Sequence, residues 1–189
     1  PYPMYNREFY RSDDMHLCIS KQTKNIVKNV LKDHPKPDWA IQYVPHGIEE
    51  TLYYPVINDF EFEAYKERLL DNKEYNFIVF HNSRNIRRKN QSDIILSWKV
   101  FLDQLPEEQA KKCLLILKTE PIFDHGTDLT AVIDSLCDPE IHKVKILNHK
   151  YSEEHLNYLY NISDAHMFMT DNEGWGLGLT ESLTAGRMI

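Results

Sequence analysis

Residues 75–117, YNFIVFHNSRNIRRKNQSDIILSWKVFLDQLPEEQAKKCLLIL, contain a strand, a helix and a second strand in succession. FIVF (77–80) and CLLIL (113–117) are short apolar runs, typical of strands that are buried on both faces. Between them, the apolar residues of 91–105 recur on one helical face, with Ser92 as the expected N-cap and a proline as the stop. Two strands joined by a helix of this length predict a right-handed crossover in a parallel sheet.

The alternation of strands and helices continues toward the C-terminus. VKIL (144–147) and AHMFM (165–169) are further strand candidates, and helices are expected at about 129–136, from Ser152 onward and within 174–186. The predicted fold class is therefore α/β, a Rossmann-like parallel sheet with flanking helices. Ligands of such sheets bind beyond the carboxyl ends of the strands, so we expect chemistry in the loops 81–90, 118–127, 148–152 and 170–177.

The N-terminal third of the chain is less regular. Residues 1–14 are aromatic and polar without a period and are expected to form a loop. Ser20 is a candidate N-cap for a helix whose apolar face includes residues 26–31. AIQYV (40–44) suits a short strand, and residues 61–71 favour a helix.

Composition narrows the function classes. The 189 residues are 42% hydrophobic and 27% charged, as in ordinary soluble globular proteins. A net charge of −7 argues against a general nucleic-acid binder, and no apolar run approaches the ~20 residues of a membrane helix. The three cysteines lie far apart without a C-x-x-C pair, so we expect neither a disulfide framework nor a zinc site. The simplest location for such a chain is the cytoplasm.

Two of the loops carry charged residues that suit an anionic or sugar ligand. The first holds four cations within six residues, Arg84, Arg87, Arg88 and Lys89, just before a predicted helix. Guanidinium and ammonium groups in that position favour an anion site, although a solvated basic loop is the alternative.

The second loop combines acids with glycines. Glu173 and Glu181 stand eight residues apart around three alternating glycines, Gly174, Gly176 and Gly178. Glycines permit close approach of a ligand to the backbone, and carboxylates accept hydrogen bonds from sugar hydroxyls. The alternative is a glycine-rich turn with solvated acids. The dinucleotide fingerprint G-x-G-x-x-G is not matched here, so NAD is not expected.

The same segments resemble a known family. EGWGLGLTESLTAG (173–186) resembles the E-x7-E signature of retaining GT-B glycosyltransferases of the glycosyl transferases group 1 family. SRNIRRKN (83–90) resembles the G-R-x4-K-G segment of their C-terminal donor-binding domain, with Ser83 and Asn90 in place of the two glycines. VPHGIE (44–49) resembles the V-P-N-G-I-D segment that closes their N-terminal domain. The matches follow one another in order over about residues 15–189.

The resemblance implies roles for individual residues. Arg84 and Lys89 would hold the donor diphosphate, Glu173 would contact the transferred sugar, and these three form the expected catalytic set. Glu181 would hold the ribose hydroxyls of the nucleotide. The remaining implied donor contacts are the backbone of Gly174, Trp175, Gly176 and Leu177, and Asn148, His149 and Lys150 beside the base.

The function implied is transfer of a sugar from a nucleotide diphosphate sugar, with retention of configuration, to an acceptor that is a glycan, lipid, protein or small molecule. The chain has no D-x-D motif, and neither metal nor cofactor is expected. Alternatives are a nucleotide-sugar epimerase or phosphorylase of GT-B fold, or a fragment that binds nucleotide sugar without turnover. By this resemblance, residues 1–50 would end an acceptor domain and 51–72 would be a linker. Residues 73–189 would be a truncated donor domain of a GT-B chain incomplete at both ends.

Overall fold

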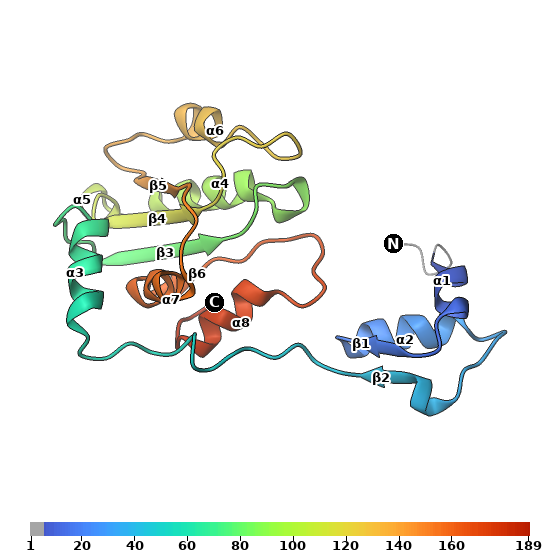
Figure 1. The fold of residues 1–189 in the computed structure, drawn as a ribbon. Helices are drawn as coiled ribbons and strands as arrows, with labels where there is room; N and C mark the ends of the chain where they lie inside the picture. Colours follow the sequence, from blue (N-terminus) through green and yellow to red (C-terminus); the bar gives the residue numbers. More distant parts are fainter. Residues whose placement is uncertain (1–5) are drawn as a thin grey trace. The chain divides into compact units, whose positions relative to one another are not determined.

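The chain divides into two compact units, Pro1–Gly47 and Ile48–Ile189, in a computed structural model that describes residues 6–189 (Figure 1). The smaller unit contains α1 (Arg7–Ser12), β1 (His16–Cys18), α2 (Lys21–Val30), a 3-10 turn (Asp38–Ala40) and β2 (Ile41–Tyr43). The strands β1 and β2 are parallel, and α2 buries Val27 against Cys18 and Ile41. Ser20 caps α2 as predicted, because its Oγ accepts a hydrogen bond from the Thr23 amide at 2.9 Å.

The helix α1 corrects the expectation of a loop over residues 1–14, of which 1–5 lie outside the described residues. The helix has no buried residue, so it shows no apolar periodicity that a sequence pattern could reveal. Its arginines instead form ion pairs with Asp33, beyond the end of α2, and Arg11 NH2 lies 3.0 Å from Asp33 Oδ2. The ion-pair partner of these two arginines is therefore distant from α1 in the sequence.

A four-stranded parallel sheet forms the centre of the larger unit, in the order β5-β4-β3-β6. Its strands are β3 (Phe77–Asn82), β4 (Cys113–Lys118), β5 (Val144–Leu147) and β6 (Ala165–His166). An isolated parallel bridge joins Ala165 to Met188, on the far side of β6 from β3. The parallel sheet predicted from the apolar runs is confirmed.

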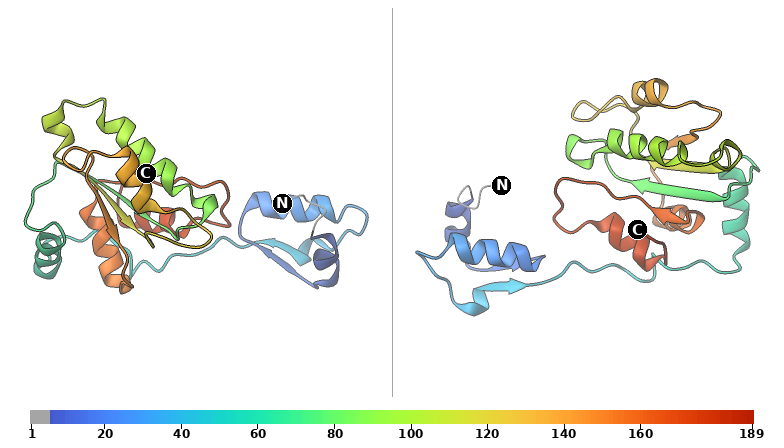
Figure 2. Two further views of the ribbon diagram at one scale, coloured as in Figure 1. Left: turned by 90° about the horizontal axis from the view of Figure 1, so that it is seen from above. Right: turned by 180° about the vertical axis from the view of Figure 1, so that it is seen from behind.

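Helices cover both faces of this sheet. The helices are α3 (Phe60–Leu69), α4 (Gln91–Leu102), α5 (Glu107–Ala110), α6 (Leu129–Leu136), α7 (Glu153–Ile162) and α8 (Leu177–Thr184), with a 3-10 turn at Arg87–Lys89. Alternate strand residues enter two separate cores: Phe80 and Ile116 pack with α3 and α7, whereas Leu115 packs with α4 and α6. Seen from behind, α4 lies in front of the strands, on the face opposite to α7 (Figure 2).

Two element ends differ from the sequence prediction. The helix α4 begins at Gln91 after Asn90, which adopts a left-handed conformation with φ 46°, so Ser92 lies in the first turn and is not the N-cap. The strand β6 is two residues long, although the sequence predicted a strand over residues 165–169. Beyond β6, the Met167 carbonyl accepts a hydrogen bond from the His81 ring at 2.8 Å. This carbonyl is therefore bonded to a side chain and not to the backbone of a neighbouring strand.

Candidate functional site

The carboxyl ends of β3 and β6 meet where the strand order reverses. From β3 the chain proceeds through β4 to β5 at one edge, and then returns to place β6 on the other side of β3. Such a reversal opens a crevice between the diverging loops, which is the usual ligand position in this class of sheet. The loops at this point are 83–90 and 170–176, the two that carry the predicted charged residues.

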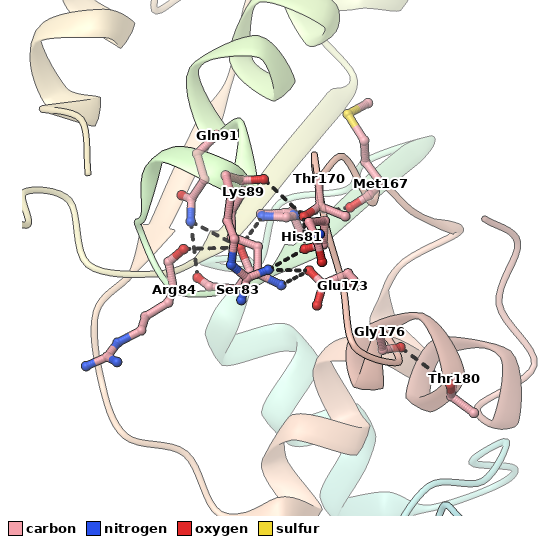
Figure 3. Close-up of polar contacts among 12 residues, drawn as sticks. His81, Ser83, Arg84, Lys89, Gln91, Met167, Thr170, Glu173, Gly176 and Thr180 are labelled. Atoms are coloured by element: carbon pink, nitrogen blue, oxygen red, sulfur yellow. Dashed lines mark hydrogen bonds and ion pairs between the residues drawn. The ribbon is translucent and has the colours of Figure 1, made fainter. Parts of the chain in front are cut away.

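Lys89 and Glu173 join these loops. The Lys89 ammonium forms an ion pair with Glu173 Oε1, and Arg88 NH1 lies 3.1 Å from the same oxygen (Figure 3). Arg88 also donates to the Asn172 carbonyl at 2.6 Å. Burial raises the pKa of Glu173, but the hydrogen bond and charge of Lys89, with smaller effects of Thr170 and Arg88, outweigh it and hold the pKa below its usual value. Glu173 is therefore a carboxylate at neutral pH.

The backbone strengthens the same junction. The Asp171 amide and the Thr170 hydroxyl both donate to the Arg88 carbonyl, at 2.9 Å and 3.0 Å. Asn90 Nδ2 donates to Asp171 Oδ1 at 2.7 Å. The two loops are thus also held together by hydrogen bonds outside the Lys89–Glu173 pair, two to the Arg88 carbonyl and one to the Asp171 carboxylate.

Arg84 does not share in this cluster. Its guanidinium lies 5.3 Å from the centre of the Phe123 ring, and the side chain is exposed and points away from Glu173 (Figure 3). The neighbouring Asn85 is buried and clamps its loop to residues 120–127, since its Nδ2 donates to the Thr127 carbonyl at 2.6 Å and its Oδ1 accepts from the Thr127 amide at 3.0 Å. Of the three expected catalytic residues, the structure joins Lys89 and Glu173 and leaves Arg84 apart.

Glu181 lies one turn into α8 and has a different environment. Its Oε2 accepts a hydrogen bond from the Tyr160 hydroxyl at 2.6 Å, and Asn82 Nδ2 donates to that hydroxyl at 3.1 Å. Burial raises the pKa of Glu181, and Tyr160 and Lys118 only partly oppose that effect. This carboxyl group is supported by a neutral donor rather than paired with a cation.

Between the two acids, the backbone turns sharply into α8. Gly176 is buried, has φ 89° and caps the helix without a side-chain hydrogen bond, and its carbonyl accepts from the Thr180 hydroxyl at 3.4 Å (Figure 3). A Cβ at this position would be strained because L side chains rarely adopt this φ. The first N–H groups of a helix have no intrahelical acceptor, so Leu177 and Gly178 present donors at this end.

The other predicted donor contacts are placed as follows. Gly174 is exposed and Trp175 is half-buried, both in the turn before α8. Asn148, His149 and Lys150 are exposed and follow β5 at the sheet edge, two strands from β3 or about 10 Å by strand spacing. They lie on the ligand side of the sheet but outside the Lys89–Glu173 cluster.

A buried polar group behind the loop 83–90 was not assigned from the sequence. His81 lies at the end of β3, and its Nδ1 donates to the Met167 carbonyl. Its Nε2 therefore accepts from the Ser83 hydroxyl at 2.7 Å, and Gln91 Nε2 donates to that hydroxyl at 3.2 Å. Burial lowers the pKa of His81 to about 4, which keeps the ring neutral. The sequence signal for His81 is its position, since it is a polar residue directly after the apolar run 77–80.

Asn82 and Tyr160 were also missed as site residues. Tyr160 is buried on α7, and its hydroxyl donates to Glu181. A hydroxyl on an inward helical position needs a partner, and that requirement was the signal in the sequence.

Residues 6–189 contain neither a membrane-spanning helix nor a cluster of side chains suited to a metal ion. No helix in this range is long and apolar enough to cross a membrane. In the same described part of the chain, no cluster of three or more His, Cys, Asp and Glu side chains has an arrangement suited to a metal ion.

Comparison with known proteins gives structural similarity alone, since no family model and no curated protein sequence matches the chain. An α,α-trehalose-phosphate synthase (UDP-forming) from Burkholderia vietnamiensis superposes with a TM-score of 0.73 at 11% identity, over 95% of this chain and 43% of that one. Sucrose-phosphate synthase from Thermosynechococcus elongatus gives a TM-score of 0.68 at 18% identity, over 98% and 42%. The chain thus spans less than half the length of these two proteins.

A third similar structure covers a single domain. The C-terminal domain of the glycosyl transferase group 1 family protein LpcC from Francisella tularensis gives a TM-score of 0.57 at 14% identity, over 75% of this chain and 68% of that one. At sequence identities this low, the similarity shows a shared fold and does not show a shared activity. The chain has an α/β fold with parallel sheets and flanking helices, of the kind found in GT-B glycosyltransferases, as the sequence predicted.

Proposed function

We propose that this chain is the donor-binding part of a retaining glycosyltransferase that uses a nucleotide diphosphate sugar. The observation that carries the proposal is the meeting of Lys89 and Glu173 from two separate loops at the strand-order reversal, beside the N-terminus of α8. Preorganised positive charge and N–H dipoles are what a departing diphosphate requires. The names of the similar proteins, one of them UDP-forming, support the same substrate class.

In this proposal, Lys89 binds the diphosphate, and its ion pair with Glu173 breaks. The Glu173 carboxylate then accepts hydrogen bonds from hydroxyls of the transferred sugar. Arg84 rotates from Phe123 toward the diphosphate, and the amides of Gly174, Trp175, Gly176 and Leu177 surround the sugar. The proposed base contacts are those of Asn148, His149 and Lys150, at the β5 edge.

The proposed chemistry retains the anomeric configuration. The bond from the anomeric carbon to the leaving phosphate oxygen breaks, a bond to the acceptor oxygen forms on the same face, and the acceptor proton passes to the leaving phosphate. Lys89 stabilises the negative charge that grows on the diphosphate. No metal or cofactor takes part in this scheme.

Titration of the 189-residue chain with UDP-glucose and, separately, GDP-mannose tests the proposal. We expect one of them to bind, and Lys89→Ala to weaken its affinity about tenfold or more, as for loss of a hydrogen bond to a charged group. Glu181→Ala should weaken binding to a similar extent, and Arg84→Ala less, since its side chain must first leave Phe123.

Two substitutions serve as matched controls. Lys111→Ala removes a lysine paired with Glu107 on the surface, and Arg68→Ala removes an arginine that lies over the Tyr65 ring as Arg84 lies over Phe123. Both should bind like the wild type. If Lys89→Ala and Glu181→Ala also bind like the wild type while remaining folded, the donor site is elsewhere. Slow hydrolysis of the bound sugar would distinguish a transferase from a chain that only binds.

A further inference from the structure

Tyr160 lies in the last turns of α7 and its side chain is completely buried. The rings of Tyr53, Phe80 and His166 contact it edge-on, with centroids 6.0, 5.1 and 5.4 Å away and interplanar angles of 74°, 77° and 88°. The ring is thus closely packed against three other rings in the core. The position of the Tyr160 hydroxyl is therefore set by the core and not by any ligand.

The direction of the hydrogen bonds through Tyr160 is also set. Burial and the nearby Glu181 charge raise the pKa of Tyr160 far above its usual value, so the hydroxyl keeps its proton. An ionised carboxylate can only accept, so the hydroxyl donates to Glu181 Oε2 and receives from Asn82 Nδ2. The chain of donors runs from Asn82 through Tyr160 to Glu181.

This arrangement leaves one oxygen of Glu181 for a ligand. Tyr160 is the sole hydrogen-bond donor to Glu181 among residues 6–189, and it occupies Oε2. The other charged groups that act on this carboxyl are Lys118 at the end of β4 and Glu153 at the start of α7, and Glu181 in turn raises the pKa of buried Tyr53. Because Asn82 directly precedes the loop 83–90, the same chain connects the carboxylate to the cationic loop.

We infer that Asn82 and Tyr160 are a positioning pair, which aims Oε1 of Glu181 at a ligand hydroxyl and makes the site select a nucleotide that carries ribose hydroxyls. The inference rests on the proposed function, because it assigns the support of a residue in that donor site. A site built to hydrogen-bond a hydroxyl discriminates against the analogue that lacks it, since its polar group is then left unpaired.

The test compares Tyr160→Phe with the wild type for UDP and 2′,3′-dideoxy-UDP, and for GDP and 2′,3′-dideoxy-GDP. We expect the wild type to prefer the ribonucleotide, and Tyr160→Phe to reduce that preference about tenfold, while affinity for the dideoxy compound is unchanged. The matched control is Tyr158→Phe, on the same helix, whose hydroxyl faces Asp59 at 3.4 Å. This control should keep the wild-type preference.

A second readout does not depend on nucleotide binding. The Tyr160 hydrogen bond lowers the pKa of Glu181, so Tyr160→Phe should raise that pKa, as measured by carbon-13 NMR titration of the carboxyl group. An unchanged preference with Tyr160→Phe, or an unchanged Glu181 pKa, overturns the positioning role and leaves the proposed function standing. If the wild type binds neither nucleotide, the proposed function fails, and the selection of ribose hydroxyls inferred here fails with it.

Discussion

Glu173 and Glu181 are the same residue type, eight positions apart around one glycine-rich turn, and the fold treats them in opposite ways. Glu173 pairs with Lys89 and Arg88, and its pKa lies below the usual value. Glu181 accepts from an uncharged tyrosine hydroxyl, and burial holds its pKa above the usual value. One carboxylate is neutralised by the neighbouring loop, and the other is oriented by the core around Tyr160.

The contrast shows two ways of preparing a polar group for a ligand. The Lys89–Glu173 ion pair must separate before either partner can bind a ligand with its full charge. The free energy needed to break the pair therefore offsets part of the free energy of ligand binding. Glu181 needs no such exchange, because Tyr160 donates from below whether or not a ligand is present. Glu173 must thus change its partner when a ligand binds, whereas Glu181 is preorganised for binding.

The largest effect that would break this contrast comes from removing the core beneath Glu181. Tyr160→Ala leaves a cavity among Phe80, Tyr53 and His166, and should lower the free energy of unfolding by about 3–5 kcal/mol. Arg88→Ala, on the Glu173 side, should lower it by less than about 1 kcal/mol, because Arg88 is exposed. Urea denaturation of both variants gives the comparison.

Similar losses for Tyr160→Ala and Arg88→Ala would contradict the distinction between a core-supported and a loop-supported carboxylate. Tyr160→Phe serves as the control, since it keeps the ring packing and removes only the hydroxyl. Its loss should be well below that of Tyr160→Ala.

Local patterns predicted most of the larger unit because its core is periodic. The four strands and the helices α4, α6, α7 and α8 follow apolar runs and helical faces, and Ser20 and Ser152 cap helices as their positions indicated. α1 buries nothing and is accompanied by ion pairs to Asp33, so no pattern marks it. Asn90 precedes α4 in a left-handed conformation and makes no side-chain cap hydrogen bond, so the sequence prediction of Ser92, two positions later, missed it.

The loops that hold the candidate site residues could be predicted from the sequence, but the contacts among those residues could not. The loops that hold Lys89 and Glu173 could be named from the positions of the strands, and their ion pair follows from the strand order, which brings β6 beside β3. The contact of Arg84 with Phe123 comes from a loop of irregular backbone. The Tyr160–Glu181 hydrogen bond depends on the rotation of α7 against α8, which single-sequence periodicity does not define.

A double-mutant cycle on Glu173→Gln and Lys89→Met sharpens the loop side of the comparison. Both side chains are largely covered, with 19% and 13% of their surface exposed, so the coupling should exceed that of an open surface pair and reach about 1 kcal/mol. Because both side chains are largely covered, raising the salt from 0.05 to 0.5 M should lower this coupling less than it lowers that of an exposed pair.

The cycle is measured by urea denaturation at pH 7. The pair Glu107 and Lys111 is the control, since these residues are four apart in the sequence, at α5, with 61% and 36% of their side chains exposed, and should couple by about 0.3–0.5 kcal/mol. Coupling at Lys89–Glu173 no larger than this would show that the hydrogen bonds to the Arg88 carbonyl and to Asp171 hold the two loops together without the ion pair.

The smallest effect is a difference in the sign of pH dependence between the two acids. Because the pKa of Glu181 is raised in the folded chain, the folded state binds this proton more readily than the unfolded state does. The wild type therefore gains stability as the pH falls toward the pKa that Glu181 has in the unfolded chain. At pH 7, Glu181→Gln should therefore be more stable than the wild type by about 0.5 kcal/mol, and the difference should vanish near pH 4.

Glu173→Gln should behave in the opposite way. Its folded pKa is lowered, so the wild-type residue stabilises the fold above its unfolded pKa, and that contribution is lost as the pH falls through the folded value. Thermal unfolding at pH 7 and pH 4 checks both variants, with Glu140→Gln, at an exposed position, as the control. If Glu181→Gln and Glu173→Gln change stability with the same sign at pH 7, the two ends of the motif do not differ as argued, since burial alone would then govern both carboxylates.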